Sequence, residues 1–291
     1  MKILSVRIKE QAKIKNVQQY VIEKDYALSY VLAGIAANKD LHPYLIFKGG
    51  TALKKNFFGE YRFSEDLDFS AINSPKEDKL EIALLNSMKV SSELLNQYGL
   101  AFDIKLKRYS ERDPHPNGQE AFNVFVKFPW QREATRCRIK IEITHDEPVI
   151  LAPEKRLILH GYDEDLNASI LCYPIEEIVA EKLRALLQTQ QKLVMRGWSG
   201  PRVRDYYDLW RILKHYDNHL NKEKLITTLD KKCEHRSVSY KSIDDFFTPE
   251  LEKAAQQHWH NSLGVLIPGL PVCIDVLNET KLLVLKTIFE G

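Results

Sequence analysis

Two carboxylates separated by one residue occur in the segment Asp66-Leu67-Asp68-Phe69. Successive side chains of a strand point to opposite faces, so a strand here places both aspartates on one face and Leu67 and Phe69 on the other, toward a core. Carboxylates held this close repel each other unless a cation lies between them. Mg²⁺ prefers hard oxygen ligands and commonly joins one or two carboxylates to substrate phosphates. The pattern therefore predicts a magnesium site, although a solvated strand edge would show the same spacing.

A glycine turn precedes these aspartates in the sequence Gly49-Gly50-Thr51, which follows a short β-like run at 44–47. Glycine lets backbone N–H groups approach an anion closely, and the start of a following helix adds its dipole. The turn and Asp66 lie about fifteen residues apart, on what we expect to be consecutive strands. The arrangement predicts a triphosphate cradle beside the metal ligands, whereas the glycines alone would fit an ordinary tight turn equally well.

A third acid follows from the alternation in segment 138–143, where three isoleucines take one face and Arg138, Lys140 and Glu142 take the other. Glu142 joins the two aspartates if this strand is their neighbour in the sheet. An exposed polar strand face explains the pattern equally well.

A lysine interrupts the apolar stripe of a helix expected to begin at Ile175. Ile178, Val179 and Leu186 belong to this stripe, and Lys182 falls in its middle. An inward lysine is unfavourable unless it snorkels or meets an anion. A nucleotide phosphate is one such anion, so Lys182 is a candidate binding residue.

The next helix carries two aspartates with different surroundings. Asp208 is within helix reach of Arg204 and Arg211, so we expect it in a surface ion-pair cluster. Asp205 lies on a largely apolar side, where Lys182 is a candidate partner. The sides of the helix on which the two aspartates lie therefore favour Asp205 over Asp208 as a functional residue.

Basic residues are concentrated at 182–214, with eight lysines and arginines against two acids. Arginines suit phosphate contacts, and aromatic rings can stack an unpaired base. The residues concerned are Arg196, Arg202, Arg204 and Arg211, with Trp198 and Trp210. The alternative is that the arginines pair with the two aspartates and that the tryptophans belong to the core.

These residues need a mixed sheet with helices to position them. Helices are expected at 17–38, 51–58, 77–98, 175–190 and 202–216, and strands at 44–47, 63–72, 101–109, 121–128 and 135–144. The order gives an α+β fold with a sheet flanked by helices at 1–168 and a helical C-terminal domain at 169–291.

Composition excludes several classes of protein. The 291 residues include 42 Lys and Arg against 40 Asp and Glu, so the net charge of +2 identifies no partner. Four cysteines lie far apart without metal-ligand spacing, which favours a reducing cytoplasm over a disulfide framework. Neither an apolar leader at the first residues nor a stretch approaching eighteen apolar residues is present, so we expect no membrane span.

Taken together, the motifs resemble the AbiEii/AbiGii-type toxins, nucleotidyltransferases of the DNA polymerase β superfamily. The matching sequences are KGGTAL (48–53), RFSEDLDF (62–69), EIVAEKLRAL (177–186) and RDYYDL (204–209), with IEKDY (22–26) before the first strand. The resemblance covers about residues 20–215. It implies a polymerase-β-like sheet with a helical C-terminal part, an NTP substrate, Mg²⁺ or Mn²⁺ as cofactor, and an antitoxin encoded alongside.

The resemblance also assigns residues. It implies nucleotide binding by Lys48, Gly49, Gly50, Thr51, Ser64 and Lys182, metal binding by Asp66, Asp68 and Glu142, and completion of the catalytic set by Lys182 and Asp205. Some members add nucleotides to tRNA 3′ ends, so we expect transfer of NMP to an RNA acceptor. Protein AMPylation and a catalytically idle nucleotide-binding module are the competing hypotheses.

Overall fold

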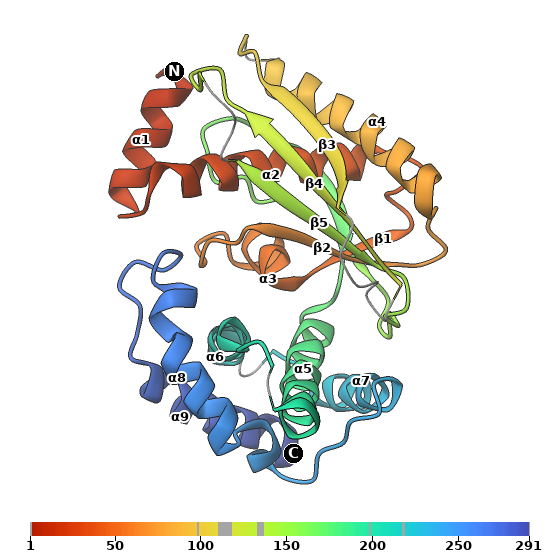
Figure 1. Ribbon diagram of the computed structural model, residues 1–291, viewed down its shortest axis with the longest axis vertical. Helices are drawn as coiled ribbons and strands as arrows, with labels where there is room; N and C mark the ends of the chain where they lie inside the picture. The colour runs from red at the N-terminus through yellow and green to blue at the C-terminus, as the bar shows by residue number, and fades with distance from the viewer. Residues whose placement is uncertain are drawn as a thin grey trace. The chain divides into compact units, whose positions relative to one another are not determined.

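The computed structural model describes residues 2–97, 99–109, 118–132, 137–197, 199–216 and 219–290. The chain forms two compact units, and each is described by itself (Figure 1). The first unit comprises Met1–Val149 with Pro153–Tyr173, and the second comprises Ile150–Ala152 with Pro174–Gly291. The sequence placed the division between 168 and 169. It falls after Tyr173 instead, because a last short strand at Ser169–Cys172 pairs within the sheet of the first unit.

A seven-stranded mixed sheet forms the centre of the first unit, in the order β3-β4-β5-β2-β1-β7-β6. The strands are β1 (Leu45–Lys48), β2 (Asp66–Ala71), β3 (Asp103–Tyr109), β4 (Gln119–Lys127), β5 (Arg138–Thr144), β6 (Glu154–Leu157) and β7 (Ser169–Cys172). The first five correspond to the strands expected from alternation. β6 and β7 were not anticipated, because four residues are too few to show a period.

Two long helices pack on the apolar face of the sheet. They are α2 (Gln19–Ala37) and α4 (Glu77–Asn96), which contact each other as well as strands β5 and β3 (Figure 1). The isoleucines of β5 are fully buried on this face. Helix α2 is buried on nearly all sides, as expected for a helix in the centre of a core. A first helix, α1 (Leu4–Ile14), packs on α2 and was not expected from the sequence.

The turn after β1 leads directly into helical structure. A short helix α3 (Gly49–Ala52) continues into the π-helical segment η1 (Leu53–Phe58). The helix therefore starts at the glycines and not after them, which places Gly49 and Gly50 in its first turn.

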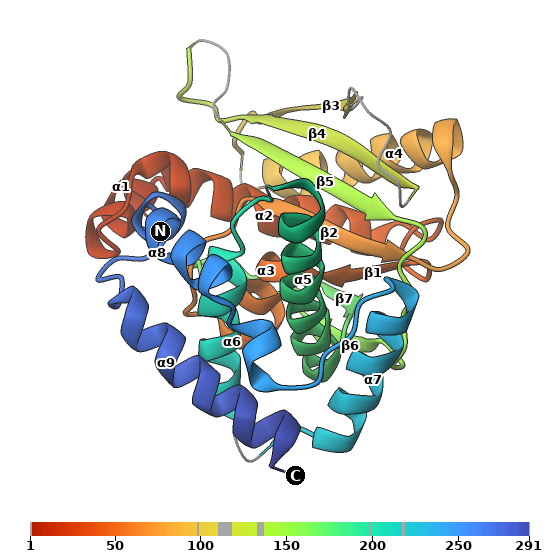
Figure 2. The same ribbon diagram turned by 60° about the horizontal axis from the view of Figure 1, so that its bottom comes forward.

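The second unit is helical within its described part (Figure 2). Its helices are α5 (Ile175–Arg196), α6 (Val203–Tyr216), α7 (Lys222–His235), α8 (Pro249–Leu263) and α9 (Cys273–Val284), with the short segments η2 (Ile243–Phe246) and η3 (Leu285–Phe289). Helix α5 packs on α7, and α6 packs on α8 and α9. Across the residues that can be described in both units, every helix is too short or too polar to cross a membrane.

Candidate active site

The glycine turn and the paired aspartates lie side by side in the first unit. Strand β1 ends at Lys48 and β2 begins at Asp66, and the two strands are antiparallel, with Lys48 opposite Asp68. Asp66 and Asp68 are part-exposed on one face of β2, whereas Leu67 and Phe69 are fully buried on the other. The expected juxtaposition of the turn and the carboxylates is therefore present.

The two glycines of the turn leave room for neighbouring charged side chains. Gly49 has a φ of +80°, and a Cβ there would lie 2.4 Å from Asp68 Oδ2. A Cβ at Gly50 would lie 2.2 Å from Arg62 Nη2. No side chain fits at either position without moving these groups, because real Cβ contacts do not come below 3.0 Å. The turn thus has a carboxylate against one glycine and a guanidinium against the next.

Arg62 is a site residue that sequence reasoning missed. Its side chain lies over Gly50, donates to the backbone carbonyl of Phe63 at 3.3 Å, and is only 5% exposed as a residue. Arginine suits bidentate phosphate contacts. The sequence did show this arginine, which stands four residues before Asp66 in the matching segment RFSEDLDF (62–69). Its burial, which calls for an anion or several carbonyl partners, is visible only in the structure.

Two hydroxyls expected to bind nucleotide are used inside the protein. Thr51 is 1% exposed, and its hydroxyl lies 2.7 Å from Ser64 Oγ and donates to the backbone carbonyl of Asp66. These bonds tie the first helical turn to the start of β2. Thr51 and Ser64 therefore help to position the backbone at Asp66, and their assignment to nucleotide binding stays a prediction.

Lys48 lies at the same end of the sheet. The residue is 8% exposed, and its Nζ lies 5.8 Å from the centre of the Tyr173 ring, within the range of a cation–π contact. The sequence assigned it to nucleotide binding with the glycines, and its position at the end of β1 brings it beside Gly49.

Glu142 occupies the expected neighbouring strand. Strand β5 is parallel to β2, with Glu142 opposite Asp68 and Lys140 opposite Asp66. The Glu142 carboxylate accepts from Gln119 and from Lys140 Nζ at 2.8 Å. Among the described residues, no three His, Cys, Asp or Glu side chains are grouped closely enough to hold a metal ion. Asp66 and Asp68 are therefore the candidate donor pair, and the Glu142 carboxylate is engaged by Gln119 and Lys140.

The donor pair fits the chemistry of Mg²⁺. Both groups are carboxylates, both are part-exposed, and they share one face of a rigid central strand. Mg²⁺ is commonly bound by one or two carboxylates with substrate phosphates completing its shell. Two oxygen donors beside a glycine turn are therefore compatible with a metal bound together with a nucleotide.

A buried ion pair anchors the segment that follows the turn. Lys55 Nζ lies 3.0 Å from Asp25 Oδ1 on α2, and both side chains are almost completely buried. Burial lowers the pKa of Lys55 to about 8, while the Asp25 charge opposes this shift. Tyr162 donates to the other carboxylate oxygen of Asp25 at 3.0 Å. Helical segment 49–58 is thereby fixed to the core, which holds the glycine turn in place.

The second unit contains a separate charged cluster. Lys182 Nζ on α5 lies 2.9 Å from Asp205 Oδ1 and 2.7 Å from Asp208 Oδ2, both on α6. Lys182 is inward-facing and meets Asp205, as its helical position predicted. The expectation for Asp208 was wrong: its side chain is 0% exposed and bonds Lys182 instead of lying in a surface arginine cluster. The prediction considered only residues within reach of Asp208 along α6, and its partner Lys182 is on α5.

Another buried pair in this unit also escaped the sequence analysis. Glu177 and Lys232 are fully buried, with Nζ 3.0 Å from Oε1. The Glu177 carboxylate also accepts from the backbone N–H groups of Ile150 and Leu151, each at 2.9 Å. It therefore joins α7 and the short segment 150–152 to α5.

The aromatic residues of α6 and the preceding Arg202 make internal contacts. Tyr206 and Tyr207 are buried, and the Tyr206 hydroxyl donates to the carbonyl of Phe246. Trp210 donates to Glu279, and Arg202 approaches Asp205 at 3.7 Å. Trp198 lies outside the described residues. For Arg202, Tyr206, Tyr207 and Trp210 these contacts fit the structural alternative.

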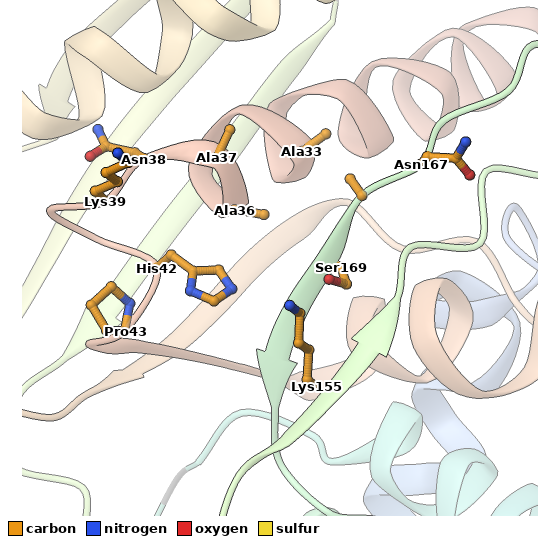
Figure 3. A pocket seen from close by; sticks show the side chains of 11 residues that line it. Ala33, Ala36, Ala37, Asn38, Lys39, His42, Pro43, Lys155, Asn167 and Ser169 are labelled. Atoms are coloured by element: carbon orange, nitrogen blue, oxygen red, sulfur yellow. The ribbon is translucent and has the colours of Figure 1, made fainter.

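A cavity of about 540 Å³ lies elsewhere in the first unit (Figure 3). Its walls include His42 and Pro43 before β1, Lys155 of β6 and Ser169 of β7. These residues are at the end of β1 opposite the glycine turn, because β1 runs from Leu45 to Lys48. The cavity is therefore distinct from the candidate active site.

Comparison with known proteins agrees with this geometry. Residues 30–277 match the family described as "Nucleotidyl transferase AbiEii toxin, Type IV TA system". The fold is similar to MenT4, the nucleotidyltransferase toxin Rv2826c from Mycobacterium tuberculosis H37Rv, with a TM-score of 0.64 and 18% identity, covering 97% of this chain and 90% of that one. It is also similar to JHP933 from Helicobacter pylori, with a TM-score of 0.54 and 19% identity, covering 92% and 91% of the two chains. No curated protein is a significant match.

The family match spans most of the chain and includes the glycine turn, the aspartate pair and the α5–α6 cluster. The α+β fold agrees with that of the two solved structures. The chain belongs to the AbiEii family of nucleotidyltransferase toxins.

Proposed function

We propose that this nucleotidyltransferase moves NMP from an NTP to an RNA acceptor, with the 3′ end of tRNA as the preferred substrate, in a reaction that requires Mg²⁺. The observation that carries this proposal is the contact between the glycine turn and the aspartate pair, where Gly49 leaves room for the Asp68 carboxylate. The candidate phosphate cradle at the end of β1 and the candidate metal ligands of β2 lie on adjacent, paired strands, which supports the proposal. The resemblance to toxins that modify tRNA 3′ ends supports RNA as the acceptor.

In this reaction an acceptor hydroxyl oxygen attacks the α-phosphorus of the NTP. A new P–O bond forms, the bond from the α-phosphorus to the β-phosphate oxygen breaks, pyrophosphate leaves, and the hydroxyl proton passes to a base. Asp66 and Asp68 would hold Mg²⁺, which neutralises charge on the phosphates as the transfer proceeds. Arg62 and the N–H groups of the glycine turn are placed to position phosphate oxygens.

We propose that Lys182 and Asp205 are also required for transfer, as the resemblance implies. Lys182 is shared between two carboxylates, so its charge is already balanced within the second unit. Asp205 is the more exposed of the two, with 16% of its side chain accessible. Asp205 is therefore the member of this cluster best placed to meet a ligand.

As a toxin of a toxin–antitoxin family, the protein is expected to be controlled by an antitoxin encoded alongside it. The transfer experiment incubates the full chain with Mg²⁺, each of the four α-labelled NTPs and total cellular RNA. We expect label at the 3′ end of tRNA with one preferred NTP. Label on protein and never on RNA would favour AMPylation, and label on neither would favour a nucleotide-binding module.

A further inference from the structure

The active-site face of the sheet continues well beyond the two aspartates. Asp66 lies opposite Lys140 of β5, Lys140 opposite Asn123 of β4, and Asn123 opposite Lys107 of β3. Directly opposed residues share a face, so these four side chains form one row across the sheet. At about 4.8 Å per strand spacing, the row extends roughly 14 Å from Asp66 to the edge strand β3.

Neighbouring rows of the same face add further basic and aromatic residues, together with Asp103, Ala121 and Glu142. The basic, aromatic and amide side chains of this face are Lys105, Lys107 and Tyr109 of β3, Asn123, Phe125 and Lys127 of β4, and Arg138 and Lys140 of β5. We call it the β3–β5 polar face. It differs sharply from the opposite face of the same strands, where Phe122, Val124 and Ile141 are fully buried.

Positive charge predominates on this face. Five lysines and arginines face two acids outside the aspartate pair, Asp103 and Glu142, which pair with Lys105 at 3.2 Å and Lys140 at 2.8 Å. Lys107, Lys127 and Arg138 have no acidic partner among the residues that the structure describes. An ordinary solvated surface mixes both signs. Here cations without a described acidic partner share a face of the sheet with the proposed metal site.

Exposed aromatic rings accompany the cations. Tyr109 is 42% exposed, Phe125 is part-exposed, and Lys140 Nζ lies 5.1 Å from the centre of the Tyr109 ring. Cations that follow a phosphate backbone, together with rings that stack bases, are the combination that binds single-stranded nucleic acid. Unstacked bases at RNA ends are recognised by aromatic side chains in the same way.

We propose that the β3–β5 polar face binds the single-stranded end of the RNA acceptor and directs its terminal hydroxyl toward Asp66 and Asp68. This inference rests on the proposed function and adds the surface that holds the acceptor. Lys107, Lys127 and Arg138 contact phosphates, and Tyr109 stacks a base. In the helical segment 182–214, where the sequence had placed this role, Arg202, Tyr206 and Trp210 are engaged in internal contacts.

The test compares two double charge reversals that change net charge equally. Lys107→Glu/Arg138→Glu alters the proposed surface, and Lys9→Glu/Lys13→Glu alters exposed lysines of α1. For each protein, the affinity for deacylated tRNA is measured by fluorescence anisotropy without NTP, and NTP affinity is measured without RNA. We expect the first variant to bind tRNA at least about tenfold more weakly, with NTP affinity unchanged within twofold. For this variant, the slope of the logarithm of the tRNA association constant against the logarithm of salt concentration should be smaller in magnitude by about 0.7 for each lost phosphate contact.

Transfer assays on the wild-type chain separate the two ways of failing. If the wild type labels RNA but Lys107→Glu/Arg138→Glu binds tRNA as the α1 variant does, the surface assignment is overturned and the proposed function stands. If the wild type labels only protein, the RNA acceptor is rejected and this inference falls with it. A drop in tRNA affinity on Tyr109→Ala, without a drop in NTP affinity, is the further result expected from base stacking.

Discussion

The aspartates of β2 and those of α6 have the same side chain in contrasting surroundings. Asp66 and Asp68 are part-exposed, share one face of a central strand and lie beside a glycine turn. Asp208 is fully buried, and it and Asp205 share the ammonium group of Lys182. Carboxylates placed together on an accessible strand face suit a cationic ligand, whereas a carboxylate buried against a lysine holds helices together. Substitutions of Asp68 and of Asp208 should therefore separate activity from stability.

The largest effect is expected on activity at the strand pair. Asp68→Ala should reduce transfer by about a thousandfold or more, equivalent to roughly 4 kcal/mol of transition-state stabilisation, because metal-assisted charge neutralisation is lost. The melting temperature should fall by no more than about 3 °C, since only a part-exposed side chain is removed. Incorporation of α-labelled nucleotide and thermal unfolding are measured on the same preparation. Full activity of Asp68→Ala with Mg²⁺ present would show that Asp68 is not a ligand of a required metal ion.

Asp208, the fully buried member of the cluster, should show the reverse pattern. Leaving a buried charge without a partner costs about 3 to 5 kcal/mol, and Asp208→Asn should cost less, about 1 to 3 kcal/mol, because Lys182 keeps Asp205 as a partner. Asp205→Asn should cost less, because its side chain is 16% exposed and water can replace part of the contact. Urea unfolding measures both. Equal, small losses of unfolding free energy would contradict the contrast between the two regions.

A smaller effect on activity is expected at the turn. Gly49→Ala places a Cβ where Asp68 Oδ2 lies, and a displacement of about 1 Å in an active site can cost about a hundredfold in rate. Gly99→Ala is the matched control, because its φ of +75° carries similar backbone strain and the added Cβ would meet no atom of the described residues within 4 Å. We expect similar loss of stability in both variants and loss of transfer in Gly49→Ala alone. Parallel loss of transfer in both would assign the effect to backbone strain.

A buried histidine of the first unit should make the stability of the fold depend on pH. His160 is packed among Tyr26, Tyr30 and Tyr162, and burial, aided by the Lys55 charge, lowers its pKa to about 3. Between an ordinary pKa near 6.5 and about 3, the unfolded chain binds a proton that the folded chain does not. Stability is therefore lost as pH falls through this window, by up to about 1.4 kcal/mol per pH unit. His160→Phe should flatten the dependence of urea unfolding on pH between 7 and 5, and an unchanged slope would contradict this origin.

Local patterns in the sequence predicted the strand site well. Alternation places Asp66 and Asp68 on one face, and the glycine–aspartate spacing places the turn beside them, because both depend on neighbours along two consecutive strands. Glu142 was a candidate only if its strand adjoined β2; β5 does adjoin it, and the carboxylate is engaged by Gln119 and Lys140. The long helices α2, α4, α5 and α6 were also expected from the sequence.

Contacts between distant segments were the part that the sequence could not provide. Asp208 was misplaced because its partner is on another helix, and Lys55 was overlooked because Asp25 lies thirty residues away. The basic β3–β5 polar face becomes visible only once the strand order is known. Lys107 and Asp66 lie in the same row across the sheet, but two strands separate them. Composition gave no indication of it, because the net charge is only +2.

The most direct test of the strand pair as a metal site is Mn²⁺ binding. An electron paramagnetic resonance titration with a non-reactive NTP analogue compares the wild type with Asp66→Asn/Asp68→Asn and with Asp103→Asn, an exposed aspartate of β3. We expect nucleotide-dependent Mn²⁺ binding in the wild type and in Asp103→Asn, and at least about tenfold weaker binding in the strand variant, because both donor charges are gone. If Asp66→Asn/Asp68→Asn binds Mn²⁺ as tightly as the wild type, the two aspartates are not the metal ligands.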